Sequence, residues 1–226
     1  MNRFFSMDNK FFQVMGRIAD LIILNLVFLV CCIPIITIGP ALTALHYVTL
    51  KMARNEESYI LRSFFKSFKQ NFRQGLIINL ILLATAAILY VDFRLIPVIG
   101  GTTAKVLQYL LMVLAFLFAM MYMYIYPLLA KFYNPITAVL KNSLLMAIRH
   151  LPYTILEMIV TALPFGILLI PNLQIQATLL MLFILMGGAL IAFINGRFFA
   201  KIFDNYIPKE EEEETSPNLP DAENPS

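Results

Sequence analysis

Long apolar stretches alternate with short basic segments along this chain. Residues 21–50, 74–91, 106–130 and 158–196 contain no Asp, Glu, Lys or Arg. A helix that crosses the hydrocarbon core of a bilayer needs about 20 mainly apolar residues. The pattern therefore predicts an all-α, polytopic membrane protein rather than a water-soluble domain.

Two of the apolar stretches are longer than a single span and contain turn signals. Pro34 and Gly39–Pro40 interrupt the first stretch, and Pro171–Asn172 interrupts the last one. Because Pro and Gly clusters mark turns, each stretch is predicted to form a helical hairpin, which gives six membrane passages. The second arm of the first hairpin, residues 41–52, is short. Whether it crosses the membrane fully stays open.

The basic residues favour six passages over five. With both termini in the cytoplasm, six passages place only Arg94 and Lys105 outside, and 15 of the 17 Lys and Arg inside. A five-passage arrangement moves Arg3, Lys10 and Arg17 outside and gives 12 against 5. Short cytoplasmic loops are enriched in Lys and Arg. We therefore expect a multi-pass protein of the bacterial cytoplasmic membrane.

Composition and charge divide the chain into two parts. Hydrophobic residues make up 60% and charged residues 14%, whereas soluble domains are about half apolar and a quarter charged. Half of the 14 acidic residues fall in the last 17 positions, including the run Glu210 to Glu214. Residues 1–207 are predicted to form the helical membrane domain, and residues 208–226 a disordered acidic cytoplasmic tail.

One segment between the spans has the pattern of an amphipathic helix. Its basic and aromatic residues both follow a spacing of three to four, on opposite faces: Arg62, Lys66, Lys69 and Arg73 on one, and Phe64, Phe65, Phe68 and Phe72 on the other. Asn55, followed by two glutamates, is predicted to cap its start. The helix either anchors the protein to the inner membrane surface or docks a soluble partner.

A second segment of this kind is predicted to begin at Asn134–Pro135, and it carries Lys141 and Arg149. Pro is favoured at the first position of a helix. Each segment precedes an apolar hairpin, and an aromatic N-terminal stretch precedes the first hairpin. The sequence therefore indicates a unit of surface helix plus hairpin that is used about three times, although identity between the copies is slight.

Several short motifs resemble those of the YesL family of bacterial integral membrane proteins. The matching residues are Met1–Asn2–Arg3–Phe4–Phe5, Gly16–Arg17, Asp20, Asn25, Cys32–Ile33–Pro34, Ile38–Gly39–Pro40–Ala41–Leu42 and the segment 54–72. The resemblance extends over residues 1 to about 207. It implies a domain of unknown function and a context of carbohydrate import, especially of pectin-derived oligosaccharides. It implies no catalytic residues.

No pattern in the chain indicates catalysis. The phosphate-binding glycine motifs are absent, and the two histidines, His46 and His150, are far apart in the sequence, with no H-E-x-x-H motif or cysteine–histidine cluster. We therefore expect no enzymatic activity and no cofactor.

Ionisable and polar residues within spans are candidates for function, because they are costly in lipid. Asp20 follows Arg17 by three residues, so a local ion pair is the simpler interpretation. Asn25 is a candidate bridge to a neighbouring helix. His46 is a candidate for the lining of a polar cavity.

Glu157 lies about 8 Å into its helix at 1.5 Å per residue. It is predicted to pair with Arg197 or Lys201, and a role in proton or substrate transfer is the alternative.

The last span carries a stripe of small residues, Gly188, Ala192 and Gly196, at four-residue spacing. Such stripes let helices approach closely. This stripe is predicted to pack either inside the protein or against a second copy.

These observations favour a non-enzymatic accessory or regulatory component of carbohydrate uptake by an ABC-type importer. The E-A-A-x-x-x-G loop of importer permeases is absent. The alternative is a stand-alone small-solute transporter or channel with a path along Asn25, His46 and Glu157. The expected partners are the lipid bilayer, importer permease subunits and, in a homo-oligomer, further copies of the chain. No nucleic acid is expected.

Overall fold

The computed structural model describes residues 10–56 and 59–206, and the tail 208–226 lies outside this range. The described residues form helices and no strand, so the predicted all-α fold is confirmed. The helices are α1 (Lys10–Cys32), η1 (Ile35–Thr37), α2 (Ile38–Ala53), α3 (Ile60–Gln70), α4 (Phe72–Ile99), α5 (Gly101–Lys131), α6 (Ile136–Arg149), α7 (Leu151–Ala162), η2 (Leu163–Leu169), α8 (Leu173–Leu182), η3 (Phe183–Gly187) and α9 (Gly188–Phe203).

Six helical segments of the described chain are long and apolar enough to cross a membrane. They are Phe11–Cys32, Ile35–Ala53, Phe72–Ile99, Gly101–Lys131, Leu151–Leu169 and Leu173–Phe203. This number agrees with the six passages predicted from the apolar stretches.

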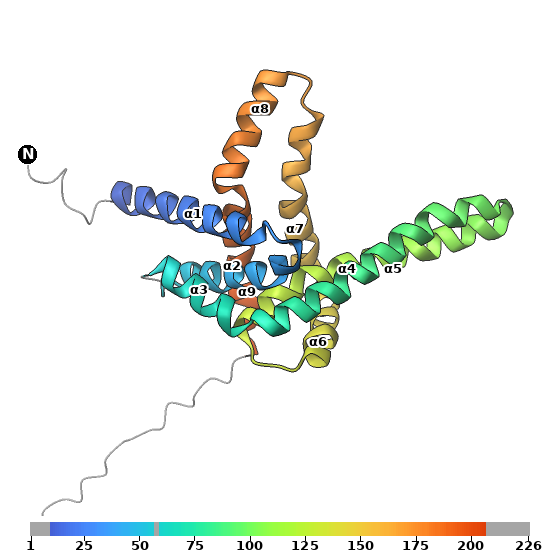
Figure 1. The fold of residues 1–226 in the computed structure, drawn as a ribbon, viewed down its shortest axis with the longest axis horizontal. Coiled ribbons are helices and arrows are strands. Elements are labelled where there is room, and N and C mark those ends of the chain that lie inside the picture. The colour runs from blue at the N-terminus through green and yellow to red at the C-terminus, as the bar shows by residue number, and fades with distance from the viewer. Residues whose placement is uncertain (1–9, 57–58, 207–226) are drawn as a thin grey trace, which may run out of the picture.

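Three hairpins extend in different directions from a common centre (Figure 1). α1 and α2 run antiparallel, α4 and α5 project to the right of the view as a long arm, and α7 and α8 project upward. α3 precedes the second hairpin and α6 precedes the third, which is the order of the predicted repeating unit. The end of each hairpin nearest the centre is called its base below, and the opposite end its tip.

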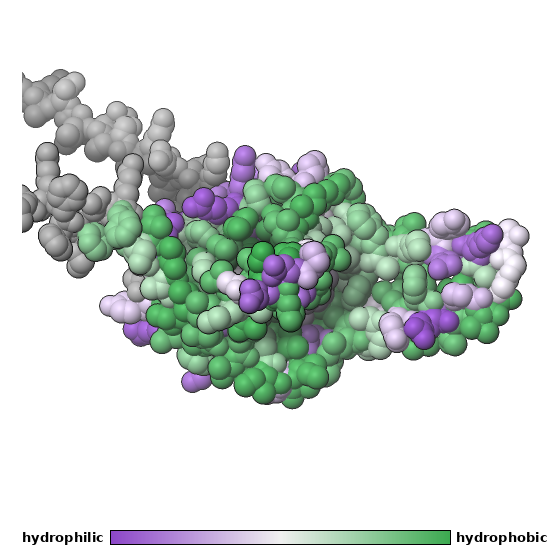
Figure 2. Space-filling view, turned by 90° about the horizontal axis from the view of Figure 1, so that it is seen from above, coloured by the Kyte–Doolittle hydropathy of each residue, from purple (hydrophilic) through white to green (hydrophobic). Residues whose placement is uncertain are grey.

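The outer surfaces of the arms are apolar. Figure 2 shows a mostly hydrophobic surface, with hydrophilic residues gathered at the tip of the α4–α5 arm and at the tip of the α7–α8 hairpin, which points toward the viewer. The sequence near these tips contains Asp92, Arg94, Lys105 and Asn172. An apolar band that ends in a polar tip is the pattern expected of a helical hairpin in a bilayer.

α2 differs from the other candidate spans because it lies at the centre of the protein. In its most apolar stretch 56% of the residues are buried, against 11 to 17% in the others. Its first residue pair, Gly39 and Pro40, packs against the base of α4. A Cβ atom on Gly39 would lie 2.2 Å from the carbonyl oxygen of Gly75, so only glycine allows this approach.

The connection between α1 and α2 therefore lies beside the base of α4. Asn79 donates a hydrogen bond of 3.1 Å to the carbonyl oxygen of Ile35, and the hydroxyl of Tyr126 donates one of 3.2 Å to the side-chain oxygen of Asn79. Gly75 is three residues, or about 4.5 Å, from the start of α4. The tip of α4, at Ile99, is 24 residues away, or about 36 Å.

Two predicted helix starts are wrong. Asn55 has a positive φ of 59° and lies in the turn after α2, a conformation that asparagine tolerates better than most residues. The predicted helix instead begins at Ile60 and ends before Asn71, whose side chain donates to the carbonyl oxygen of Ser67 at 3.1 Å. Phe72 and Arg73 consequently belong to α4.

In the second case the residue before the first helical position is Pro135 and not Asn134. Pro135 has an extended conformation, and its carbonyl oxygen accepts the hydrogen bond of Val139 at 3.0 Å. The carbonyl oxygen of Asn134 accepts a bond of 2.5 Å from Gln74, which ties this loop to the base of α4.

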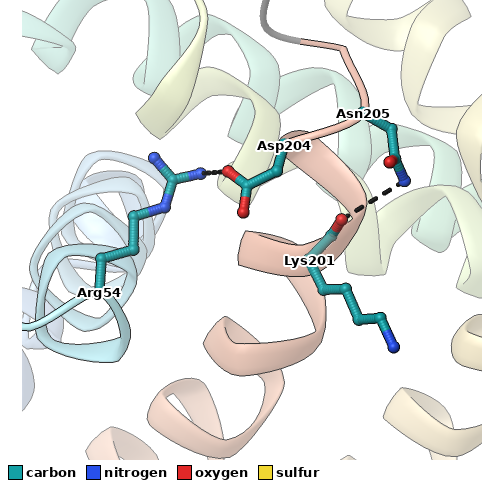
Figure 3. A network of polar contacts seen from close by, with 4 residues as sticks. All are labelled: Arg54, Lys201, Asp204 and Asn205. Atoms are coloured by element: carbon teal, nitrogen blue, oxygen red, sulfur yellow. Dashed lines mark hydrogen bonds and ion pairs between the residues drawn. The ribbon is translucent and has the colours of Figure 1, made fainter. Parts of the chain in front are cut away.

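The ends of α2 and α9 are joined by an ion pair between Arg54 and Asp204 (Figure 3). Asp204 is 61% exposed, so the pair contributes little to stability. Below it, aromatic rings fill the core: Tyr124 and Phe199 meet edge to face with centroids 5.1 Å apart, and Phe199 stacks on Phe203 at 5.6 Å.

Candidate functional site

A cavity of about 410 Å³ lies between α2, α5, η2, α8 and α9. Its lining is mainly apolar, with polar groups from only a few side chains. The lining residues include Leu42, Leu45, Pro164, Leu180, Phe183, Ile191 and Phe199, together with His46, Tyr122, Tyr126, Thr161 and Asn195. Phe165 and Leu168 also line it and are 69% and 59% exposed. The cavity therefore reaches the protein surface at η2.

Two polar atoms in this lining are buried and have no hydrogen-bond partner in the described chain. One is Nδ1 of His46, on α2, and the other is the side-chain oxygen of Asn195, on α9. The amide nitrogen of Asn195 donates a bond of 3.0 Å to the hydroxyl of Thr161, which orients the side chain. Phe199 lies one helical turn after Asn195, and its ring meets the ring of His46 edge to face at 6.1 Å.

His46 was expected to line a polar cavity, and it lines one that is mainly apolar. Asn195 was not among the candidates, although it is an uncharged polar residue inside an apolar span, as Asn25 is. The rule that selected Asn25 would have selected Asn195 as well.

Asn25 bridges α1 to the start of α9, so this prediction is confirmed. Its amide nitrogen donates a hydrogen bond of 2.7 Å to the carbonyl oxygen of Ile184. Its side-chain oxygen accepts a hydrogen bond of 2.9 Å from the N–H of Ala189. Residues Phe183–Gly187 form a π-helical turn, which breaks the regular α-helical hydrogen-bond pattern. Asn25 supplies hydrogen-bond partners to the carbonyl group of Ile184 in this turn and to the N–H group of Ala189 just after it. These bonds hold the π turn against α1.

The small-residue stripe packs inside this chain, which settles the alternative left open by the sequence. A Cβ on Gly188 would lie 2.9 Å from the side-chain oxygen of Asn25, and one on Gly196 would lie 3.3 Å from the carbonyl oxygen of Thr49. Ala192 is 4% exposed and packs in the core between α1 and α2.

The predicted ion pair of Glu157 is not formed. Glu157 is fully buried on α7, and neither of its carboxylate oxygens has a hydrogen-bond partner among the described residues. Both expected partners are exposed and face aromatic rings. The guanidinium of Arg197 lies 5.2 Å from the ring of Phe193, and the amine of Lys201 lies 6.0 Å from the ring of Tyr153. Glu157 lies in the protein interior, whereas the two cations lie on the exposed surface of α9.

Arg17 donates a hydrogen bond to the side-chain oxygen of Asn55, which connects α1 to the turn after α2. Asp20 is half-buried on the same helix, and it also interacts with another group. The ion pair between Arg17 and Asp20 stays a prediction.

The amphipathic helix α3 packs its aromatic side on the protein. Phe64 is fully buried in the core that α1 and α2 share, and Phe68 is partly buried against it. The two rings stack at 6.1 Å. Phe65 and Phe72 stay exposed, at 43% and 39%. The four basic residues are all exposed, namely Arg62, Lys66, Lys69 and Arg73.

In the part of the chain that the structure describes, no group of three or more His, Cys, Asp or Glu residues lies close enough to hold a metal ion. The arrangement offers a mainly apolar cavity with two unpartnered polar atoms. It also offers a basic face outside that cavity.

Comparisons with known proteins connect these features to a family. The family described as "Protein of unknown function, DUF624" matches residues 21–93, which run from α1 through most of α4. The chain is 28% identical over 160 residues to the uncharacterized protein YteU of Bacillus subtilis, covering 70% of this chain and 72% of the relative. It is 25% identical over 209 residues to YesL of the same organism, covering 92% and 95%.

No solved structure matches the chain. The match to YesL includes all three hairpins, since 92% of the chain is aligned. The resemblance noted in the sequence is confirmed: the chain is similar to YesL over nearly its whole length, it matches a family of unknown function over residues 21–93, and it has six helical segments apolar enough to span a membrane.

Proposed function

We propose that the protein is a non-enzymatic accessory or regulatory component of carbohydrate uptake by an ABC-type importer, and that α3 is its docking surface. The observation that carries this proposal is the rigid basic face of α3. Phe64 is held in the core, so the backbone of α3 is fixed. Four cations at helical spacing then form an ordered array on the outside. Such an array complements an acidic surface on a partner.

The carbohydrate context of this proposal rests on the family resemblance. The cavity supports an accessory role over a path for sugars, because its lining is mainly apolar. An oligosaccharide carries many hydroxyl groups, and each one loses free energy when it leaves water without a new hydrogen-bond partner. Few side chains in the cavity offer such partners.

The experiment is a purification from native membranes with a charge-reversed docking face. The wild-type protein is expected to carry importer permease subunits with it, as identified by mass spectrometry. The double variant Lys66→Glu, Lys69→Glu is expected to lose them. A matched control reverses Arg94 and Lys105, which are also basic and exposed but lie near the tip of the α4–α5 arm. Equal recovery of permease subunits with both variants would contradict the docking role of α3.

The proposal places both termini, and therefore α3, in the cytoplasm, as the partition of Lys and Arg favours. Single cysteines at residues 3 and 215 are then expected to resist a membrane-impermeant reagent added to intact cells. Labelling at either position would overturn this orientation.

One observation favours a second candidate function, that of a small-solute transporter. Buried polar atoms without partners, such as those of His46 and Asn195 in the cavity, are typical of solute paths in membrane proteins. Purified protein in liposomes should then move solute without other subunits, which an accessory component does not do.

A further inference from the structure

We propose that the cavity between α2, η2, α8 and α9 binds an apolar molecule that carries one hydroxyl group, with the hydroxyl placed between His46 and Asn195. This inference is independent of the docking role of α3.

The size of the cavity fits a ligand rather than a packing defect. Small-molecule pockets have volumes of about 300–1,000 Å³, and an apolar cavity of about 150 Å³ already holds benzene. The present cavity, at about 410 Å³, lies within the first range. Its lining residues come from eight different elements, so a bound molecule would be surrounded by side chains except at the entrance. Water alone would fill this volume poorly, because most of the lining is apolar and offers no hydrogen-bond partner.

The polar end of the cavity matches a hydroxyl group. The side-chain oxygen of Asn195 accepts hydrogen bonds only, and its amide nitrogen is already engaged with Thr161 at 3.0 Å. Asn195 is 4% exposed, so this oxygen needs a donor from within the cavity. Nδ1 of His46 donates or accepts according to the tautomer. A hydroxyl both donates and accepts, so it suits either of these atoms.

Charged head groups do not fit this polar end. None of the side chains that line the cavity belongs to Lys, Arg, Asp or Glu. A carboxylate or ammonium group would therefore be buried without an opposite charge, which is costly. The ligand class is consequently a neutral alcohol with an apolar body.

The entrance lies where the chain meets lipid. Phe165 and Leu168 on η2 line the cavity and are also largely exposed, and both belong to a candidate span. η2 is a 3-10 helix of seven residues that follows α7, and runs of this length are uncommon. Leu180 on α8 and Phe183 at the start of the π turn also contribute to the lining. An apolar alcohol can enter here without crossing water.

The experiment measures thermal unfolding of the full chain in detergent with three probes of equal length, namely 1-decanol, decane and decanoate. We expect 1-decanol to raise the midpoint in a saturable manner, and the other two to have no saturable effect. Leu168→Trp places a larger ring at the entrance and should abolish the saturable shift. Leu169→Trp is the matched control, since Leu169 is 84% exposed and does not line the cavity. It should retain the shift.

Asn195→Leu tests the polar end separately. This variant is expected to respond equally to 1-decanol and decane, a loss of preference that a merely structural role would not produce. An equal response of the wild-type protein to 1-decanol and decane would overturn the proposal, as would a preference for decanoate. An unchanged shift in Leu168→Trp would overturn it too.

Mass spectrometry of the purified protein then identifies the source of the alcohol. A hydroxylated lipid that co-purifies with the wild-type chain and is lost with Leu168→Trp supports a membrane source. Protein that is empty after purification but binds added 1-decanol supports a free solute. Tightly co-purified anionic lipid that is lost with Leu168→Trp would overturn the assignment of a neutral ligand.

Discussion

The helix α2 and the α4–α5 arm are both apolar, yet they lie in different surroundings. In α2 more than half of the most apolar stretch is buried in protein, whereas in α5 the buried share is 11%. The residues differ accordingly. The buried first half of α2 is rich in small side chains such as Gly39, Ala41 and Ala44, while the exposed residues of the arm are large, as at Leu95 and Leu110. Small residues allow helices to approach each other closely, and large apolar ones suit lipid.

This comparison bears on how α2 meets the membrane. Its start lies beside the base of α4. Toward its other end, Thr49 packs against Gly196 in the middle of α9, and Arg54, just after α2, pairs with Asp204, just after α9. α2 thus contacts the start of α4 and the second half of α9. The distribution of Lys and Arg assigns both of these regions to the cytoplasmic side. We therefore expect α2 to enter the membrane without reaching its far side, which is the alternative left open for residues 41–52.

The largest expected effect is an all-or-none difference in labelling. In a background with Cys31 and Cys32 changed to alanine, single cysteines replace Ile36, Thr102 and Asn172. All three positions are exposed, and they lie in the turn before α2, at the tip of the α4–α5 arm and at the tip of the α7–α8 hairpin. An impermeant thiol reagent added outside should label the two tips and not the turn.

The interpretation of α2 as a helix that does not cross fails if the cysteine at Ile36 is labelled as fast as the one at Asn172. A cysteine at Lys69 serves as the cytoplasmic control, since it lies on the exposed face of α3. It should react only after the cells are opened.

The next effect in size separates the two sides of α3. Phe64→Ala leaves a cavity in the core around α2, because Phe64 is fully buried there. It should lower the free energy of unfolding by about 3–5 kcal/mol. Phe65→Ala, at a neighbouring position that is 43% exposed, should change it by less than about 1 kcal/mol. Unfolding in mixed detergent micelles measures both. Equal losses would mean that α3 does not depend on α2 for its position.

A smaller loss is expected where α2 meets α4. Gly39→Ala places a Cβ 2.2 Å from a backbone oxygen, so the helices must move apart. Overpacking of this kind costs about 1–3 kcal/mol. Gly16→Ala is the control, because nothing lies within 4 Å of the added atom and the site is helical. Alanine there should stabilise α1 by about 0.5–1 kcal/mol. Losses of similar size at both sites would show that the close approach of α2 and α4 does not contribute to stability.

The apolar pattern predicted the class of fold, the six candidate spans and the bridging role of Asn25. It did not place α2, because the numbers of Lys and Arg on each side are the same for a hairpin that crosses twice and for one that turns back. Hydropathy likewise could not show that η2 is a 3-10 helix or that η3 is a π turn, since both lie in uninterrupted apolar sequence. Both irregular elements contribute residues to the lining of the cavity. Its polar residues, His46 and Asn195, come together only through tertiary packing.

The smallest expected effect concerns Glu157, which is one of the two fully buried residues of α7, the other being Thr154. If the ion pair predicted from the sequence were formed, Glu157→Gln would destabilise the protein by leaving Arg197 or Lys201 unpaired. In the structure those cations lie on exposed faces against aromatic rings, and Glu157 has no partner in the described chain. Figure 3 shows the side chain of Lys201 projecting outward from α9 and away from Asp204.

Glu157→Gln therefore removes no ion pair, and it replaces an ionisable group by a neutral one of nearly the same volume. We expect the free energy of unfolding to stay within about 0.5 kcal/mol of the wild-type value or to rise, because a buried charge without a partner is costly. Thr154→Val is a useful comparison at the other buried position. The hydroxyl of Thr154 donates a hydrogen bond of 2.8 Å to the carbonyl oxygen of Ala147 and lies 3.0 Å from the hydroxyl of Tyr124. Removal of this hydroxyl should lower the free energy of unfolding by about 1–3 kcal/mol. A marked loss with Glu157→Gln that Lys201→Gln then reverses would restore the ion pair, since only a coupled charge gives such a rescue.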